Sequence, residues 1–224
     1  PVCLAVGSLS RLEHYSSFCD ILMPWTEPEP PGDLRAVDVL LTRAQELCAH
    51  RRPIWPLIQI TGAAYATDSR LDPKGNGRPP TADEYRCMAY QSLARGANGL
   101  FSFAYRVAAS RTQLDYLAPR DAPDLWQGVK RVNQELRALT PVLLEGEPVA
   151  VRCDNPQVAV RGFRYHDACY VLAANPLSVA APLKLSVPGM KTALLEVAFD
   201  TRKVQGVAAG EFADQLEPHG VRVY

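Results

Sequence analysis

The sequence predicts an α/β protein in which four strand–helix units are followed by an antiparallel all-β region. Two observations support this fold class. Short apolar runs alternate with amphipathic helical segments as far as Leu144, and beyond it short apolar runs are separated by turn residues without helical periodicity. Alternating strands and helices are typical of a parallel sheet with right-handed crossovers. We therefore expect two domains, residues 1–145 and residues 146–224.

Composition excludes several classes of protein. A chain of 224 residues can bury the core of one large domain or two modest ones. Lys and Arg together number 24, as do Asp and Glu, and we find no basic stripe of the kind that nucleic-acid binding requires. No apolar run approaches the roughly 20 residues of a membrane-spanning helix. We expect neither a nucleic-acid nor a membrane partner.

The first half of the chain contains four predicted strands, each followed by a predicted helix. The strands are Val2–Val6, Asp20–Trp25, Pro53–Thr61 and Gly99–Tyr105. The helices are Leu9–Phe18, Leu34–His50, the segment from Thr81 to Gly96, and Pro123–Leu139. The loops after the strands are longer than the loops after the helices. This asymmetry is typical of barrels and doubly wound sheets, whose sites lie at the carboxyl ends of the strands.

The third of these helices has the clearest local signals. Thr81 is a good N-cap, and Glu84 three residues later completes a capping box. Gly96 favours a C-terminal stop. The next strand, Gly99–Tyr105, is apolar and aromatic without strong polar alternation, which predicts burial on both faces.

The last third of the chain predicts a small antiparallel sandwich. The segment "RYHDACYVL" indicates a tight hairpin over His166-Asp167. Short apolar runs separated by turns favour a sandwich over other folds. The predicted strands are Val149–Cys153, Val158–Tyr165, Ala168–Ala174, Pro182–Val187, Leu194–Phe199 and Val221–Tyr224.

The six cysteines form no CxxC pair, and no Cys/His cluster has the spacing of a zinc site. Cys3, Cys48 and Cys87 lie in apolar stretches, which predicts buried free thiols. Cys153 and Cys169 lie in neighbouring predicted strands, so one disulfide is an alternative if the protein is exported. The chain begins Pro-Val-Cys, which we interpret as a processed start or a piece of a longer chain. A secreted or periplasmic location stays open.

Three segments together resemble the C-terminal half of a (β/α)8-barrel glycoside hydrolase-like protein: "PTADEYRCMAYQSLARGANGLFSFAYR", "DLWQGVKRVNQELRALTPVLLEG" and "GEFADQLEPHGVRVY". The resemblance implies that the four predicted strands are strands five to eight of the barrel. A barrel needs about 200 to 250 residues. It therefore also implies a missing N-terminal half, in the same longer chain or in a partner chain. A self-contained open sheet of four units is the alternative.

The same resemblance implies a carbohydrate substrate and two carboxylates across the scissile bond. Strand seven, "PIWPLIQIT", ends without Asp or Glu, and Gln59 stands where the nucleophile is expected. An amide cannot be that nucleophile, but it can bind a sugar hydroxyl or position a water. Glu27, in the loop after strand six, is the candidate carboxylate of this chain. The alternative for Glu27 is a solvated charge in a Pro-rich loop.

Three aromatic residues are candidates for substrate binding. Trp25 follows strand six, Trp55 lies within strand seven and Tyr105 ends strand eight. An indole or phenol ring can stack on the C–H face of a sugar. Core packing is the alternative for Trp55, and rim packing for Tyr105. We expect no metal and no cofactor.

The predicted function is hydrolysis of glycosidic bonds in an oligo- or polysaccharide. The missing carboxylate on strand seven favours an alternative, a non-catalytic carbohydrate-binding barrel. A lyase or isomerase, a third option, requires a metal or base that we do not find in the sequence.

Overall fold

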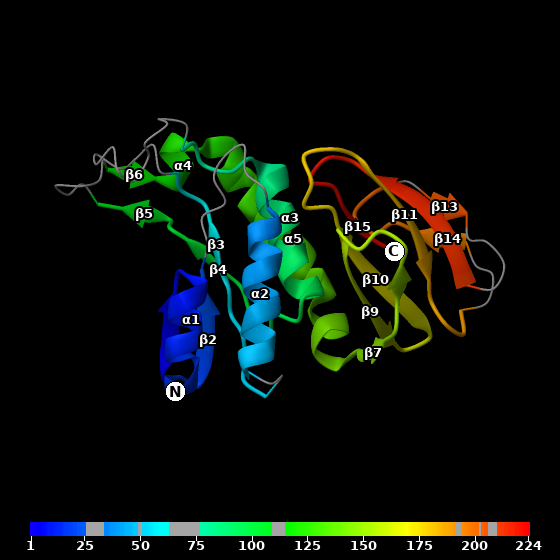
Figure 1. Cartoon of the computed structure of the whole chain (residues 1–224). Helices are drawn as coiled ribbons and strands as arrows, with labels where there is room; N and C mark the ends of the chain where they lie inside the picture. The colour runs from blue at the N-terminus through cyan, green and yellow to red at the C-terminus, as the bar shows by residue number, and fades with distance from the viewer. Residues whose placement is uncertain are drawn as a thin grey trace.

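The structure is a computed structural model, and it describes residues 1–25, 34–48, 51–62, 77–108, 115–190, 194–201, 203–205 and 210–224. Strands and helices alternate through the first half of the chain, as predicted (Figure 1). The strands there are β1 (Cys3–Val6), β2 (Ile21–Pro24), β3 (Leu57–Gln59), β4 (Phe101–Phe103), β5 (Arg106–Val107) and β6 (Tyr116–Leu117). The helices are α1 (Leu9–Tyr15), the 3-10 helix η1 (Ser16–Phe18), α2 (Arg35–Cys48), α3 (Ala82–Ala94), α4 (Ala118–Asp121) and α5 (Pro123–Glu145).

The first four strands run parallel in the order β1-β2-β3-β4. β1 pairs with β2, and β3 pairs with β4, both in parallel register. Two parallel bridges, Leu22↔Ile54 and Trp25↔Leu57, connect the two pairs. The carboxyl ends of all four strands therefore lie at the same end of one parallel array.

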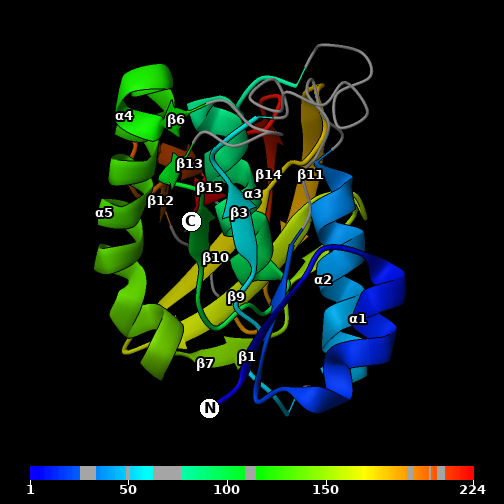
Figure 2. The ribbon, with the colours of Figure 1, turned by 90° about the vertical axis from the view of Figure 1, so that its left-hand side faces the viewer.

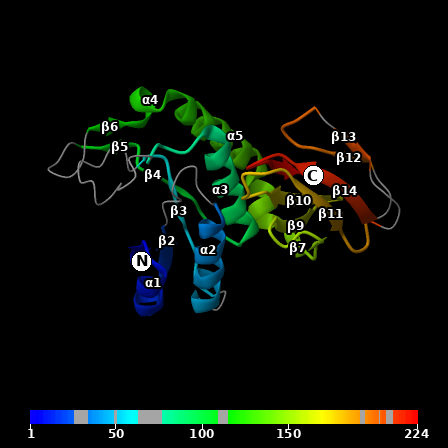
Figure 3. The same ribbon diagram turned by 45° about the horizontal axis from the view of Figure 1, so that its top comes forward.

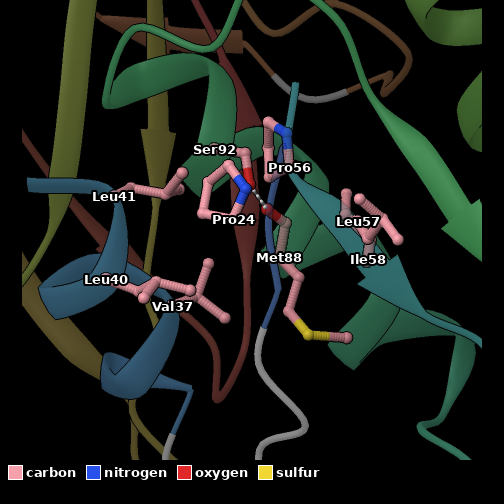
Figure 4. Close-up of a pocket in the computed structure, with 9 residues that line it drawn as sticks. All are labelled: Pro24, Val37, Leu40, Leu41, Pro56, Leu57, Ile58, Met88 and Ser92. Atoms are coloured by element: carbon pink, nitrogen blue, oxygen red, sulfur yellow. Dashed lines mark hydrogen bonds between the residues drawn. The ribbon is translucent and has the colours of Figure 1, made fainter. Parts of the chain in front are cut away.

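Helices α2 and α3 cover one face of this array. Ile58 of β3 points toward them and is buried with Leu41 of α2 and Met88 of α3 (Figure 4). The space that these side chains enclose is about 10 Å³, which is at the lower limit for a single water molecule. Within the described residues, this face of the sheet is therefore packed core.

The predicted capping box of α3 is confirmed. The Thr81 hydroxyl accepts a hydrogen bond from the Glu84 amide (3.2 Å), and the Glu84 carboxylate accepts one from the Thr81 amide (2.7 Å). Arg78 also donates to the Glu84 carboxylate at 2.7 Å. Burial raises the pKa of Glu84, but the hydrogen bonds from Arg78 and Thr81 outweigh this, and the pKa lies below its ordinary value.

The predicted burial of Gly99–Tyr105 on both faces is wrong for β4. The side chains of Phe101 and Phe103 are 47% and 40% exposed. Ser102 points to the helices, where its hydroxyl lies 2.8 Å from the Tyr85 hydroxyl. On the opposite face, which Figure 2 turns toward the viewer with β3 in front of α3, the aromatic side chains of β4 are exposed.

The last third of the chain forms antiparallel sheets, as predicted. A four-stranded sheet has the order β15-β10-β9-β7, and a three-stranded sheet has the order β14-β11-β8. The predicted hairpin at His166-Asp167 joins β9 to β10, with Tyr165 opposite Ala168 and His166 at a φ of 52°. The strands are β7 (Glu147–Val149), β8 (Arg152–Cys153), β9 (Ala159–Tyr165), β10 (Ala168–Ala174), β11 (Ala181–Ser186), β12 (Leu194–Glu196), β13 (Lys203–Gln205), β14 (Glu211–Leu216) and β15 (Val221–Val223).

The four-stranded sheet takes part in two apolar cores. On one face, Phe163 and Leu172 are buried in the same cluster as the residues of α3 and α5. On the other face, Val171 is buried with Leu185 and Phe212 of the three-stranded sheet. Helices α3 and α5 thus lie between the parallel strands and the antiparallel sheets (Figures 1 and 3).

A buried polar cluster also joins the helices to the antiparallel part. Glu135 of α5 is 7% exposed and accepts hydrogen bonds from Arg86 at 2.9 Å and from the Tyr90 hydroxyl at 2.8 Å. Arg86 donates a further bond to the carbonyl oxygen of Val221 in β15, at 3.1 Å. Burial raises the pKa of Tyr90, and the adjacent Glu135 carboxylate raises it further, so the phenol stays a donor. The division into residues 1–145 and 146–224 stays a prediction.

One cysteine differs from prediction, and one alternative is excluded. Cys153 lies in the three-stranded sheet and Cys169 in the four-stranded sheet, and both are free thiols, so the disulfide alternative is wrong. Cys48 and Cys87 are buried as predicted, but Cys3, at the start of β1, is exposed. Burial raises the pKa of the Cys87 thiol far above its usual range.

Candidate functional site

The candidate site is the rim formed by the carboxyl ends of β1 to β4. The amide of Trp25 donates to the carbonyl of Val6 (2.9 Å), which ties the end of β2 to the end of β1. The amide of Ile60 donates to the carbonyl of Phe103 (2.6 Å), which ties the end of β3 to the end of β4. Ligands of parallel α/β folds bind at such carboxyl ends.

Strand register decides which side chains share the face away from the helices. Gln59 is the register partner of Phe103, and Leu57 is the partner of both Trp25 and Phe101. Parallel register partners point to the same face, and so do residues two apart on one strand. The five side chains therefore lie on the face that α2 and α3 leave open.

Trp25 is the predicted residue that the structure places most favourably for a ligand. Its ring lies 5.6 Å from the Phe103 ring, in an edge-to-face arrangement. Gly7 lies beneath the indole, where a Cβ atom would come within 2.9 Å of Cε3, so only glycine leaves room for this position. The indole Nε1 is buried and has no hydrogen-bond partner among the described residues. A buried donor without a partner is uncommon and calls for an explanation, such as a bound water or a ligand acceptor.

Gln59 reaches the rim but is only 3% exposed. Its Nε2 donates to the carbonyl of Thr61, two residues beyond the end of β3, at 2.6 Å. This bond fixes the orientation of the amide. Gln59 can orient a neighbouring group, and it supplies no nucleophile.

Trp55 lies at the other end of the same face. Its amide donates to the Leu22 carbonyl, its ring lies 5.9 Å from the Phe101 ring, and Gly99 packs against it. Trp55 lies four positions before Gln59, which is roughly 13 Å in an extended chain. The structure therefore does not bring Trp55 to the rim.

The two remaining predicted site residues are Tyr105 and Glu27. Tyr105 follows β4, is 52% exposed and packs its ring 5.2 Å from that of Trp126 in α5. It lies beside the rim and leans toward the helix layer. Glu27 lies outside the described residues.

Two aromatic contributors to the rim could not be predicted from the sequence. The sequence predicts Phe103 only as part of a buried strand, and its place beside the Trp25 ring follows once the strand order is known. Tyr116 of β6 is fully buried, and its hydroxyl donates to the carbonyl of Ile60 just past the end of β3. Tyr116 therefore holds the β5–β6 segment against the rim. No local sequence signal identifies this contact, which joins residues 56 positions apart.

Two acidic residues next to β6, Asp115 and Asp121, accept hydrogen bonds from the same arginine, Arg120. The carboxylate of Asp115 accepts from Arg120 at 3.1 Å, and that of Asp121 accepts from Arg120 at 2.7 Å. Hydrogen bonds from Arg120, and one from the Leu117 amide, lower the pKa of Asp121 below its ordinary value. A carboxyl group with a lowered pKa stays ionised and is unsuited to act as a general acid.

A larger hollow lies elsewhere, on the antiparallel part of the chain. It measures about 1200 Å³ and is bordered by His166 and Tyr170 near the β9–β10 hairpin and by Phe199 and Tyr224. Its lining residues all belong to the segment from Arg164 to Tyr224. This hollow is separate from the rim.

The described residues contain no group of three or more His, Cys, Asp or Glu side chains placed to hold a metal ion. None of their helices is both long and apolar enough to cross a membrane.

Neither a family model nor a curated protein matches the sequence. Solved structures do match. The α-amylase of Geobacillus thermoleovorans in complex with acarbose matches with a TM-score of 0.58 at 15% identity, over 99% of this chain and 52% of that chain. The Anoxybacillus α-amylase matches with a TM-score of 0.53 at 13% identity, over 99% and 51%. The maltogenic α-amylase AmyB of Thermotoga neapolitana matches with a TM-score of 0.53 at 12% identity, over 98% and 54%.

These matches define the class of fold. The chain has an α/β fold similar to the C-terminal part of α-amylase glycoside hydrolases, as the resemblance in the sequence implied. The chain spans about half the length of the solved structures it matches. The likeness at this level of identity concerns the fold alone.

Proposed function

We propose that the chain is the second half of a (β/α)8 barrel followed by a β-sandwich, and that its rim forms one side of a carbohydrate cleft. The observation that carries this proposal is Trp25: a partly exposed indole at the carboxyl end of a parallel strand, with a buried Nε1–H that has no partner among the described residues. An indole ring offers a flat apolar surface to a sugar, and its N–H offers one donor to a hydroxyl oxygen. The fold likeness to amylases supports α-linked glucose oligomers as the ligand class.

Sugar binding by the 224-residue chain tests this proposal. We expect saturation-transfer NMR to detect maltotriose, with weaker transfer to cellotriose, whose glycosidic bonds are β-linked. Trp25→Ala should weaken binding about tenfold, which corresponds to about 1.4 kcal/mol. Trp25→Phe keeps an aromatic ring but lacks the N–H donor, so its affinity for maltotriose should lie between those of the wild type and Trp25→Ala. Trp55→Phe, at the other end of the same face, is the matched control and should bind like the wild type.

Two results would overturn the proposal. One is the absence of saturation transfer to any oligosaccharide in a panel of α- and β-linked glucose, galactose and mannose oligomers. The other is binding that Trp25→Ala leaves unchanged.

Hydrolysis is the activity we propose for the site once the barrel is complete. Glu27, two residues beyond Trp25, is the proposed carboxylate of this chain, and Gln59 is a proposed positioning residue for a sugar hydroxyl or the attacking water. The second carboxylate that the reaction needs would come from the other half of the barrel. In a protein that contains both halves of the barrel, Glu27→Gln should abolish hydrolysis of maltotriose while maltotriose binding persists.

One observation favours a non-catalytic sugar-binding barrel as the alternative. Among the described residues that end the four parallel strands, none is Asp or Glu. An assembled wild-type protein that binds maltotriose without releasing glucose or maltose would establish this alternative. Release of reducing sugar that depends on Glu27 would exclude it.

A further inference from the structure

We propose that Asn98 is a site of spontaneous covalent modification, at which the backbone nitrogen of Gly99 attacks the side-chain amide and leaves aspartate or isoaspartate at position 98. This chemistry is independent of the function proposed for the rim.

The Asn98-Gly99 pair lies in the short connection between α3 and β4. Helix α3 ends at Ala94, Gly96 turns the chain with a φ of 92°, and β4 begins at Phe101. Asn98 is exposed, so water reaches its side-chain amide. Such connections are more mobile than the helix and strand that they join, and attack by a backbone nitrogen on the preceding side chain requires that freedom.

Contacts with the segment that leads into β3 explain why this dipeptide stands here. The amide of Asn98 donates to the carbonyl of Ile54 (2.9 Å), and its Oδ1 accepts from the amide of Ile54 (3.1 Å). A Cβ atom on residue 99 would come within 2.8 Å of Cδ1 of Trp55. The fold therefore uses an asparagine followed by a glycine, although asparagine is a chemically labile residue.

The same surroundings favour attack on the side-chain amide. Glycine has no Cβ atom, so its backbone nitrogen can approach the preceding Cγ atom closely. The hydrogen bond from Ile54 to Oδ1 polarises the amide carbonyl and stabilises the negative charge that develops on this oxygen during attack.

The reaction consumes only water. The bond between Gly99 N and Asn98 Cγ forms, the attacking nitrogen loses its proton to solvent, and the bond between Cγ and Nδ2 breaks as ammonia leaves. Water then opens the cyclic imide at either of its two carbonyl groups. The net change is hydrolysis of the asparagine amide to a carboxylate, with release of ammonia and without any redox step.

The two products differ in their effect on the sheet. Aspartate keeps an oxygen in the position of Oδ1, so it can still accept from the Ile54 amide, now as a charged acceptor. Isoaspartate carries the main chain through its own Cβ atom, which lengthens the backbone. Two hydrogen bonds bracket this position, from Asn98 to Ile54 and from the Phe101 amide to the Pro56 carbonyl (3.0 Å). The longer backbone has to fit between them, so isoaspartate weakens the pairing of β4 with β3.

Other asparagines of the chain are internal controls. Asn155 and Asn175 are each followed by proline, whose nitrogen carries no hydrogen and cannot form the imide. Asn133 lies inside α5, where the next backbone N–H belongs to the helical hydrogen-bond ladder. Asn76 also precedes a glycine and lies outside the described residues.

The test stores the native 224-residue chain in mildly alkaline buffer and follows each asparagine by mass spectrometry. Trypsin cleavage after Arg95 and Arg106 releases residues 96–106, in which Asn98 is the sole asparagine. Digestion in heavy-oxygen water marks any conversion that occurs after storage. We expect progressive loss of the Asn98 amide to both acids, faster as the pH rises because the attacking nitrogen has to lose its proton. Asn133, Asn155 and Asn175 should keep their amides in the same samples.

Hydrogen exchange tests the effect on the sheet. Asn98→Asp supplies the aspartate product directly and should protect the Phe101 amide as the wild type does. In the stored chain, the form that contains isoaspartate should exchange the Phe101 amide faster than either.

Three results would overturn the proposal. An Asn98 amide that lasts as long as that of Asn133, or that is lost only in urea, would show that the folded chain prevents the attack. Equal loss at Asn155 would show general hydrolysis without participation of the next nitrogen. Unchanged protection of Phe101 in the isoaspartate form would refute the effect on β4.

Discussion

Substitution of Glu135 tests whether the buried polar cluster joins the two parts of the chain. Glu135→Gln keeps the shape of the side chain and removes its charge. Arg86, with 22% of its side chain exposed, then loses an ion pair at 2.9 Å, and Tyr90 loses its charged acceptor at 2.8 Å. Removing one member of a buried ion pair costs about 3–5 kcal/mol, a large share of the roughly 5–15 kcal/mol that stabilises a folded domain. For a chain of this length that corresponds to a fall in Tm of roughly 6–20 °C.

Urea unfolding followed by circular dichroism, with thermal melts in parallel, measures this loss. A double variant, Glu135→Leu with Arg86→Met, should recover part of the stability because no buried charge is left without a partner. Lys184→Gln is the control: it breaks a 2.7 Å pair with Glu211 whose side chains are 56% and 42% exposed, and the free energy of unfolding should not change measurably. A loss below about 1 kcal/mol for Glu135→Gln would refute the reasoning. Two separate transitions in the wild type would show that the cluster does not couple the parts.

Two further predictions concern pH and thiol chemistry. The folded-state pKa of Glu84 is lowered, so its ionised form contributes stability that is fully present above the unfolded pKa of about 4.3 and is lost as the pH falls through the folded value. Unfolding free energies between pH 7 and pH 3 should therefore decline less steeply in Glu84→Gln than in the wild type; parallel curves would contradict the ion pair with Arg78. Alkylation of the native protein followed by mass spectrometry should label the exposed Cys3 quickly and leave Cys87 unlabelled until urea is added. Rapid native labelling of Cys87 would refute its burial.

Local signals made α3 predictable from sequence, whereas contacts between distant residues decided the end of α5. The cap of α3 depends on Thr81 and Glu84, three residues apart, and both bonds of the capping box form. Helix α5 was predicted to end at Leu139, ahead of Pro141. It continues to Glu145 because Val142, one residue beyond the proline, is buried in the main core. Tertiary packing here outweighs the cost of a proline inside a helix.

The exposure of β4, the existence of β14 and the geometry around Trp25 also depend on contacts that the local sequence does not contain. The aromatic character of β4 predicted burial, but exposure depends on which elements pack against it, and the sequence of the strand does not contain that information. Strand β14 was not predicted because the acidic residues Glu211 and Asp214 interrupt the apolar pattern of its two buried residues, Phe212 and Leu216. Trp25 was identified as a site candidate from its place after a strand. Its Nε1, which has no partner within the described part of the chain, and its glycine support became visible only in three dimensions.

The four-stranded sheet has a consequence for how such proteins can evolve. It is buried on both faces: against α3 and α5 on one side and against the three-stranded sheet on the other. Cys87 of α3 donates to the carbonyl of Asn175, and Arg86 to that of Val221, so even backbone groups of the last third are matched to one helix. Recombination after Glu145 would have to supply a new sheet with the same shape and the same carbonyl positions. The last third is therefore not a freely exchangeable module, and we expect it to be inherited together with α3 and α5.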